Sequence, residues 1–343
     1  MPEVRSRLLS PLLGAVALVA VGLTGCSGGD GNARPATTTA ARADPPPPDA
    51  NTVSIEMKDY EYSVSGGLVA GRATVVLHNS GSELHMAAFG LLKEGKTLAD
   101  ARAAYQSEDE RAPESVFASP VGQAPGAILS PGQSQEVTTD LLVAGTYALL
   151  CFLPTAGAPG THLARGMAAA VVVTPGTAGH PPRPSDADYV VGDGTVEGPA
   201  TLAAGTRTLR VTAAGTGPHE FFVVRRRDPG ATYADVDGYF ARLLEGDTPP
   251  PVGYADAAPG ILAAGSFDLA SGRTVLLTTR LEPGTYLVGC ALENDPAGPG
   301  AGDGHTGEIL EVTVTEAPAR TGGRSHGPVR APGPAGADAG PSR

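Results

Sequence analysis

Four side chains that bind soft transition metals follow one another in the first half of this 343-residue chain. His85, Cys151, His162 and Met167 offer two imidazoles, a thiol and a thioether. The soft sulfur of a thiolate stabilises Cu(I), the imidazoles accommodate Cu(II), and a weak axial thioether completes a trigonal electron-transfer site. The order and types of these donors therefore predict one mononuclear copper site with four protein ligands.

A variant of this ligand set lies in the second half of the chain. Its members are His219, Cys290 and His305, and Glu308 falls where Met167 does when the closing strands of the two halves are aligned. A carboxylate in place of the thioether would favour Cu(II) and lower the reduction potential. Three alternatives stay open for this second set: a copper site, a site for another metal, or no metal site.

The two ligand sets belong to two copies of one repeated module. Leu142-Val-Ala-Gly-Thr-Tyr147 matches Leu281-Glu-Pro-Gly-Thr-Tyr286, and the paired histidines and paired cysteines are 134 and 139 residues apart. Self-similarity of this kind indicates a repeated structural unit. We expect domains at 51–175 and 189–316, joined by a linker at 176–188. The Pro-rich segment 26–50 and the tail 317–343 are expected to be disordered.

Short strands must position these ligands. Val53–Met57 alternates polar and apolar residues, and the apolar runs Thr74–Leu77 and Ala148–Cys151 are typical of strands buried on both faces. A Thr-x-x-Asp helix start in each module, at Thr97 and at Thr232, predicts one short inserted helix. The sequence therefore predicts an all-β protein with two tandem Greek-key β-sandwiches.

The N-terminus has the features of a lipoprotein signal peptide, predicted at residues 1–25. Arg5 and Arg7 precede a short apolar run that ends in Leu23-Thr24-Gly25-Cys26, which resembles the bacterial lipobox. The resemblance implies that Cys26 is lipidated and anchors the chain at the extracytoplasmic face of the cell membrane. The net charge of −12 argues against a nucleic-acid partner.

Two cysteines remain after Cys26, and in an oxidising compartment they would usually form a disulfide. Cys151 and Cys290, however, occupy equivalent positions in separate modules, each at the end of a Gly-Thr-Tyr strand. Pairing them would require the two sandwiches to meet at matched strand ends. Metal ligation is a good reason to keep each thiol free.

The ligand segments resemble those of plastocyanin- and azurin-like cupredoxins. Asn79-Ser-Gly-Ser-Glu-Leu-His85 and Gly217-Pro-His219 look like the first-histidine loop, and Cys151, His162 and Gly166-Met167 are similar to the Cys…His…Gly-Met loop. The resemblance implies the cupredoxin fold, a type 1 copper site and an electron carrier with an unidentified redox partner protein. Ten residues separate Cys151 from His162, more than in compact cupredoxins, so this loop must fold back.

Two other functions compete with electron transfer. One is copper storage or delivery without redox work, and the other is a metal-free β-sandwich module of the envelope. The chain has no His-x-His pair, and neither Cys151 nor Cys290 has a histidine beside it, whereas laccase-like oxidases and copper nitrite reductases carry both features. We therefore expect that the protein is not an enzyme.

Overall fold

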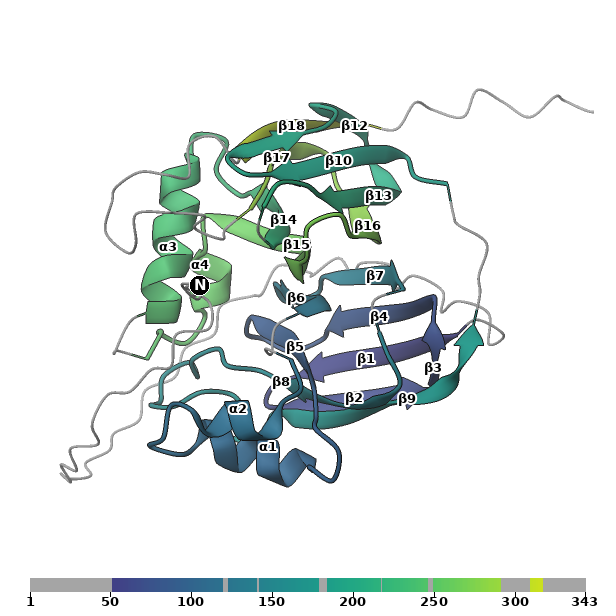
Figure 1. Cartoon of the computed structure of the whole chain (residues 1–343). Coiled ribbons are helices and arrows are strands. Elements are labelled where there is room, and N and C mark those ends of the chain that lie inside the picture. The colour runs from purple at the N-terminus through teal and green to yellow at the C-terminus, as the bar shows by residue number, and fades with distance from the viewer. Residues whose placement is uncertain are drawn as a thin grey trace, which may run out of the picture.

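The computed structural model describes residues 51–119, 123–140, 142–178, 184–216, 218–245, 249–290 and 309–316. The predicted signal peptide, Cys26, His305 and Glu308 lie outside these ranges. Within them, no helix combines the length and the apolar character needed to cross a membrane. Figure 1 shows the first module in purple to teal and the second in teal-green to yellow-green.

The first module is a sandwich of a four-strand layer and a five-strand layer, which run in the orders β2-β1-β4-β7 and β3-β9-β8-β5-β6. Its strands are β1 (Thr52–Lys58), β2 (Glu61–Gly66), β3 (Leu68–Gly71), β4 (Ala73–Asn79), β5 (His85–Leu91), β6 (Gln123–Leu129), β7 (Ser134–Thr139), β8 (Gly145–Leu150) and β9 (Ala168–Ala178). Its helices are α1 (Leu98–Tyr105) and α2 (Ala112–Val116).

The second module repeats both layers, in the orders β11-β10-β13-β16 and β12-β18-β17-β14-β15. Its strands are β10 (Ala187–Gly192), β11 (Thr195–Glu197), β12 (Thr201–Ala203), β13 (Gly205–Ala213), β14 (His219–Arg226), β15 (Gly260–Leu269), β16 (Thr274–Leu281), β17 (Gly284–Gly289) and β18 (Ile309–Thr315). Its helices are α3 (Tyr233–Glu245) and α4 (Tyr254–Ala257). The predicted all-β class with two sandwiches is confirmed, although each module contains two helices where one was expected.

The predicted helix starts explain why α1 and α3 begin where they do. Thr97 is the N-cap of α1: its side chain accepts from the backbone of Asp100, whose carboxylate in turn accepts from the Thr97 backbone. Thr232 and Asp235 make the same reciprocal hydrogen bonds in front of α3. These capping boxes satisfy backbone N–H groups that have no partner within the helix.

The repeated Gly-Thr-Tyr segment closes a turn in each module. Gly145 and Gly284 have φ of 152° and 149°, and a Cβ at Gly145 would lie 2.6 Å from a methyl of Leu91. The hydroxyl of Tyr147 donates to the carbonyl of Val143 (3.2 Å) and accepts from its amide (3.0 Å). Tyr286 makes the equivalent pair of bonds. The segment is therefore repeated because it fixes the strand that leads to each cysteine.

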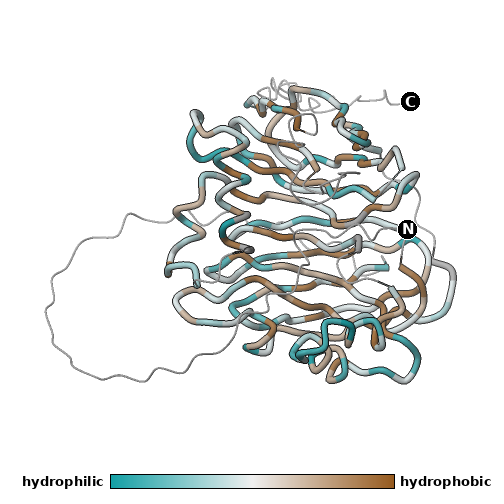
Figure 2. Tube along the Cα trace, turned by 60° about the vertical axis from the view of Figure 1, so that its left-hand side comes forward, coloured by the Kyte–Doolittle hydropathy of each residue, from teal (hydrophilic) through white to brown (hydrophobic). Residues whose placement is uncertain are grey.

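The two modules join through one continuous eight-stranded sheet, in which β7 pairs antiparallel with β16 (Figure 1). Val137 pairs with Leu277, and their residue numbers differ by 140. The repeated segments Leu129-Ser-Pro-Gly132 and Leu269-Ala-Ser-Gly272 have the same offset of 140. Equivalent residues that face each other mark a local two-fold axis. Figure 2 shows the strands of both modules stacked in one array.

The hydrophobic cores of the modules also interlock. Val137 of the first module packs in the core of the second, whereas Tyr254 and Phe267 of the second module pack in the core of the first. Because tryptophan is absent, the largest fully buried side chains are tyrosines and phenylalanines, among them Tyr189 and Phe89. The modules therefore pack against each other, a point that the sequence left open.

Gln135 provides a test of this junction. Its buried amide accepts from the backbone N–H of Gly265 (2.8 Å) and donates to the Gly265 carbonyl (3.0 Å) across the modules. Gln135→Leu would leave both backbone groups buried without these bonds, at about 1–3 kcal/mol each. We expect the free energy of unfolding, measured by chemical denaturation, to fall by about 2–4 kcal/mol. A change within about 0.5 kcal/mol, as for an ordinary surface substitution, would contradict this role.

Candidate metal centre

The sheet brings His85 and Cys151 to the same end of the first module. His85 is the first residue of β5, and Cys151 directly follows β8. These strands are antiparallel neighbours in which Ala88 pairs with Leu150, so the start of one lies beside the end of the other. His162 reaches this end from the segment between β8 and β9.

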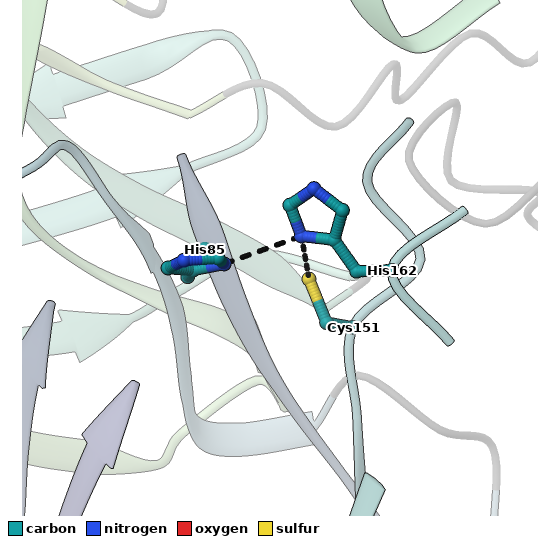
Figure 3. Close-up of side chains that lie close together, drawn as sticks. All are labelled: His85, Cys151 and His162. Atoms are coloured by element: carbon teal, nitrogen blue, oxygen red, sulfur yellow. Dashed lines mark hydrogen bonds between the residues drawn. The ribbon is translucent and has the colours of Figure 1, made fainter. Parts of the chain in front are cut away.

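Three predicted ligands converge there with their donor atoms aimed at one point. The donor atoms of His85, Cys151 and His162 all lie within 4.8 Å of one another, and each of the three residues is fully buried. His162 Nδ1 lies 3.2 Å from His85 Nδ1 and 3.3 Å from Cys151 Sγ (Figure 3). Two imidazoles and a thiol form the donor set that suits copper, so the predicted cofactor has its ligands in place.

The long loop between Cys151 and His162 returns as a small hairpin. Leu153 accepts from the amide of His162 (2.8 Å), and Thr155 donates to the carbonyl of Gly160 (2.9 Å). Cys151 itself accepts from the amide of Leu163 (2.8 Å). The loop therefore folds back as the sequence required, and its backbone hydrogen bonds fix the position of His162.

Met167, the fourth predicted ligand, is also fully buried in the first module's core. Its amide donates to the carbonyl of His162 (2.9 Å), which closes the turn before β9. Gly166 precedes it with φ of 109°, a conformation that glycine adopts at little cost. The Gly-Met pair of the sequence thus places Met167 one tight turn after His162.

Asp59 orients the first imidazole. Its Oδ1 lies 3.0 Å from Nε2 of His85 and also accepts from the amide of Ser82 (2.9 Å), while Oδ2 accepts from the Ser82 hydroxyl (2.8 Å). Burial would raise the pKa of Asp59, but the hydrogen bonds from Ser82 and His85 outweigh it and leave the pKa below its usual value. A carboxylate at one ring nitrogen directs the other toward the metal position.

Glu83 orients the second imidazole in the same way. Its Oε2 lies 3.1 Å from Nε2 of His162 and accepts from the amide of Ala156 (2.9 Å), and its Oε1 accepts from the Tyr60 hydroxyl (2.7 Å). Glu83 is only 7% exposed. Three donors therefore hold this buried carboxylate.

Tyr60 joins this network from a strained turn between β1 and β2. Its φ is 67°, and no other non-glycine residue in the described ranges has a positive φ. The ring meets that of His162 edge-on, with centroids 5.1 Å apart, and the guanidinium of Arg165 lies 5.4 Å above it. Strain of this kind concentrates at functional sites.

The protonation states of the three donors follow from their burial. Burial, with a contribution from His162, lowers the pKa of His85 to about 4, and burial also lowers the pKa of His162. Burial raises the pKa of Cys151 to about 12. Near pH 7 both rings are therefore neutral and the thiol is protonated. Since both Nε2 atoms face carboxylates, the ring protons lie on Nε2 and both Nδ1 lone pairs face the thiol.

The second module covers this centre from outside. The Tyr254 hydroxyl accepts from the amide of Leu84, next to His85, at 3.2 Å. The carbonyl of Pro250 accepts from the amide of Gly157, at the tip of the hairpin, at 2.7 Å. Pro250 and Tyr254, which is the first residue of α4, therefore hold the backbone beside His85 and at the tip of the hairpin.

The second module repeats only part of the centre within the described residues. His219 Nδ1 lies 3.8 Å from Cys290 Sγ, and Nε2 of the same ring lies 3.4 Å from Asp193, the counterpart of Asp59. In the sequence, Gly217 takes the place of Glu83. The predicted ligands His305 and Glu308 lie outside the described residues. Neither Cys151 nor Cys290 is in a disulfide, and each is buried in its own module.

Sequence reasoning missed Asp59 and Glu83. A signal for Asp59 was present, because Asp59 and Asp193 are separated by the same 134 residues as His85 and His219. Glu83 has no acidic counterpart in the second module, so the repeat gave no signal for it. His78, which was not expected to be a ligand, lies 2.6 Å from the Ser134 hydroxyl on a neighbouring strand.

The chain is similar to solved structures of copper proteins. Auracyanin B matches at 20% identity over 37% of this chain and 86% of its own, with a TM-score of 0.25. A multicopper oxidase matches at 14% identity over 77% of this chain and 88% of its own, with a TM-score of 0.21. A copper-containing nitrite reductase from Thermus scotoductus matches at 12% identity over 77% of this chain and 61% of its own, with a TM-score of 0.21. No protein-family model and no curated protein matches the chain.

These matches correct one expectation from the sequence, namely that the protein is not an enzyme. The multicopper oxidase and the nitrite reductase are enzymes by name. The missing His-x-His pair therefore does not exclude an enzyme. The two predicted β-sandwiches stand in the expected order along the chain.

Metal binding should release protons in a defined number. Near pH 7 the converging atoms carry a single proton, that of the Cys151 thiol, because the pKa of the thiol is about 12 and that of His85 about 4. One equivalent of copper should therefore displace about one proton, as measured with an indicator dye in weak buffer. Release of no proton, or of two, would contradict these protonation states.

Glu83→Gln should weaken copper binding about 10–100-fold, because the amide replaces the carboxylate that fixes the His162 tautomer. Competition with a chelator of known affinity measures this change. Asp193→Asn, which alters the equivalent carboxylate position of the second module, is the matched control and should leave the affinity of the first site unchanged. Equal affinities for the Glu83→Gln variant and the unchanged protein would show that this carboxylate does not orient the ligand.

Proposed function

We propose that this protein binds one copper ion in its first module through His85, Cys151, His162 and Met167, and passes single electrons through it. The observation that carries this proposal is the convergence of three buried donor atoms within 4.8 Å, with a carboxylate at the far nitrogen of each imidazole. Copper, when bound, supplies the Cu(II)/Cu(I) couple.

The rigidity of the surroundings supports electron transfer over copper delivery. The loop from Cys151 to His162 is a hydrogen-bonded hairpin, and Tyr254 and Pro250 of the second module hold the adjacent backbone. The length of this loop was the reason to consider a delivery protein. A braced, fully buried set of donors favours retention of the metal and small rearrangement between oxidation states.

The proposal also covers where the protein works. The lipobox-like Leu23-Thr24-Gly25-Cys26 and the Pro-rich segment that follows suit a chain anchored by lipid at the extracytoplasmic face of the cell membrane. Two buried thiols that form no disulfide in that compartment suit metal sites better than cysteines without a role. The redox partner would be another protein of that compartment.

The visible spectrum of the copper-loaded protein tests the electron-transfer site. A thiolate bound to Cu(II) gives an intense charge-transfer band, so Cys151→Ser should abolish the band. Cys290→Ser is the matched control, since it removes the equivalent thiol of the other module, and should retain the band. A colourless Cu(II) form of the unchanged protein, or a band that survives Cys151→Ser, would refute the proposal.

A further inference from the structure

A cleft of about 270 Å³ lies where the two modules join, away from the copper ligands. It is lined by the end of β7 and the start of β16, the strands that pair across the junction. Thr138 and Arg210 line it from the alternate positions of β7 and β13 that are not buried in the cores. The cleft is therefore on the solvent side of the eight-stranded sheet.

Positive charge dominates this cleft. Arg72, Arg210 and Arg273 line it, with Asp140 as the single carboxylate among the lining residues. The chain as a whole carries a net charge of −12, so three guanidinium groups around one cleft are not expected from its overall charge. Like charges gathered in one concave place attract an anion.

The carboxylates near these arginines neutralise them only weakly. Arg273 Nη2 lies 3.5 Å from Asp140 Oδ1, and Arg210 Nε lies 3.4 Å from Asp188 Oδ1. Both contacts are long, and the four side chains are 42–66% exposed, which makes such pairs worth little. The guanidinium groups of Arg210 and Arg273 therefore retain most of their attraction for another anion.

One side-chain nitrogen of these three arginines lacks a hydrogen-bond partner among the described residues. Arg210 Nε is buried and makes no hydrogen bond to any described residue, because its contact with Asp188 does not have hydrogen-bond geometry. Buried polar atoms nearly always have a partner, and where the protein supplies none, a bound ion or water molecule commonly does.

We propose that this cleft binds a phosphate group. Arginine side chains present planar, forked donors that match the oxygens of phosphate. Arg72 belongs to the first module, whereas Arg210 and Arg273 belong to the second, so a bound phosphate bridges the modules. The volume exceeds that of inorganic phosphate and leaves room for an ester, either a free phosphate ester or the headgroup of an anionic lipid.

Calorimetric titration of the full chain with inorganic phosphate, at constant ionic strength set by chloride, tests the site. Arg210→Gln and Arg273→Gln should each weaken binding about tenfold or more, since each removes a charge-assisted contact. Arg280→Gln is the matched control: Arg280 is on β16 but pairs with Glu282 outside the cleft, and its loss should leave the affinity unchanged. No binding by the unchanged protein, or equal weakening by all three substitutions, would overturn the proposal.

Two further experiments distinguish a free phosphate ester from a lipid headgroup. Both use the full chain with Cys26→Ser, which removes the proposed lipid anchor. Glycerol phosphate is titrated in one experiment. In the other, the protein is sedimented with phosphatidylglycerol vesicles and with phosphatidylcholine vesicles. Arg210-dependent binding to the ester or to the anionic vesicles supports the site and names its source. Binding to neither, or binding that Arg210→Gln does not reduce, contradicts it.

Discussion

Each imidazole of the buried centre can offer one ring nitrogen to a metal, and the carboxylate at the opposite nitrogen decides which one. Asp59 and Glu83 accept from Nε2, so the Nδ1 lone pairs of His85 and His162 face each other at 3.2 Å beside a thiol. Two acceptor nitrogens at this distance repel unless a proton or a cation lies between them. The thiol carries the one available proton, and copper would replace it. The remaining features of the first module serve to hold this arrangement away from water.

The duplicated fold shows which parts of the centre the β-sandwich itself supplies. Both modules place a histidine at the start of one strand and a cysteine at the end of its neighbour, and both place an aspartate behind the histidine. Glu83 is particular to the first module, because Gly217 stands in its place in the second. The second module contributes in another way, since its Tyr254 covers the ligand segment of the first. Within the described residues, the second module therefore repeats part of the centre and also supplies part of the cover of the first.

The sequence predicted what depends on local pattern and on the repeat. Donor types and order singled out His85, Cys151 and His162, whose donor atoms the structure brings together, and Thr-x-x-Asp identified the starts of α1 and α3. The contact between Glu83 and His162 depends on a 79-residue separation and on a loop whose path no periodicity encodes. The pairing of β7 with β16 was equally hidden, because every residue of β7 except Val137 is polar, as would suit an exposed edge strand. In the structure, the polar side chain of Gln135 bonds to backbone across the junction.

The most direct test of this account is the copper-edge X-ray absorption spectrum of the unchanged protein loaded with one equivalent of copper. We expect a nearest shell of two nitrogen atoms and one sulfur atom, as His85, His162 and Cys151 would supply. A shell of nitrogen and oxygen atoms without sulfur would show that copper binds elsewhere on the chain, and would contradict the assignment of this buried centre.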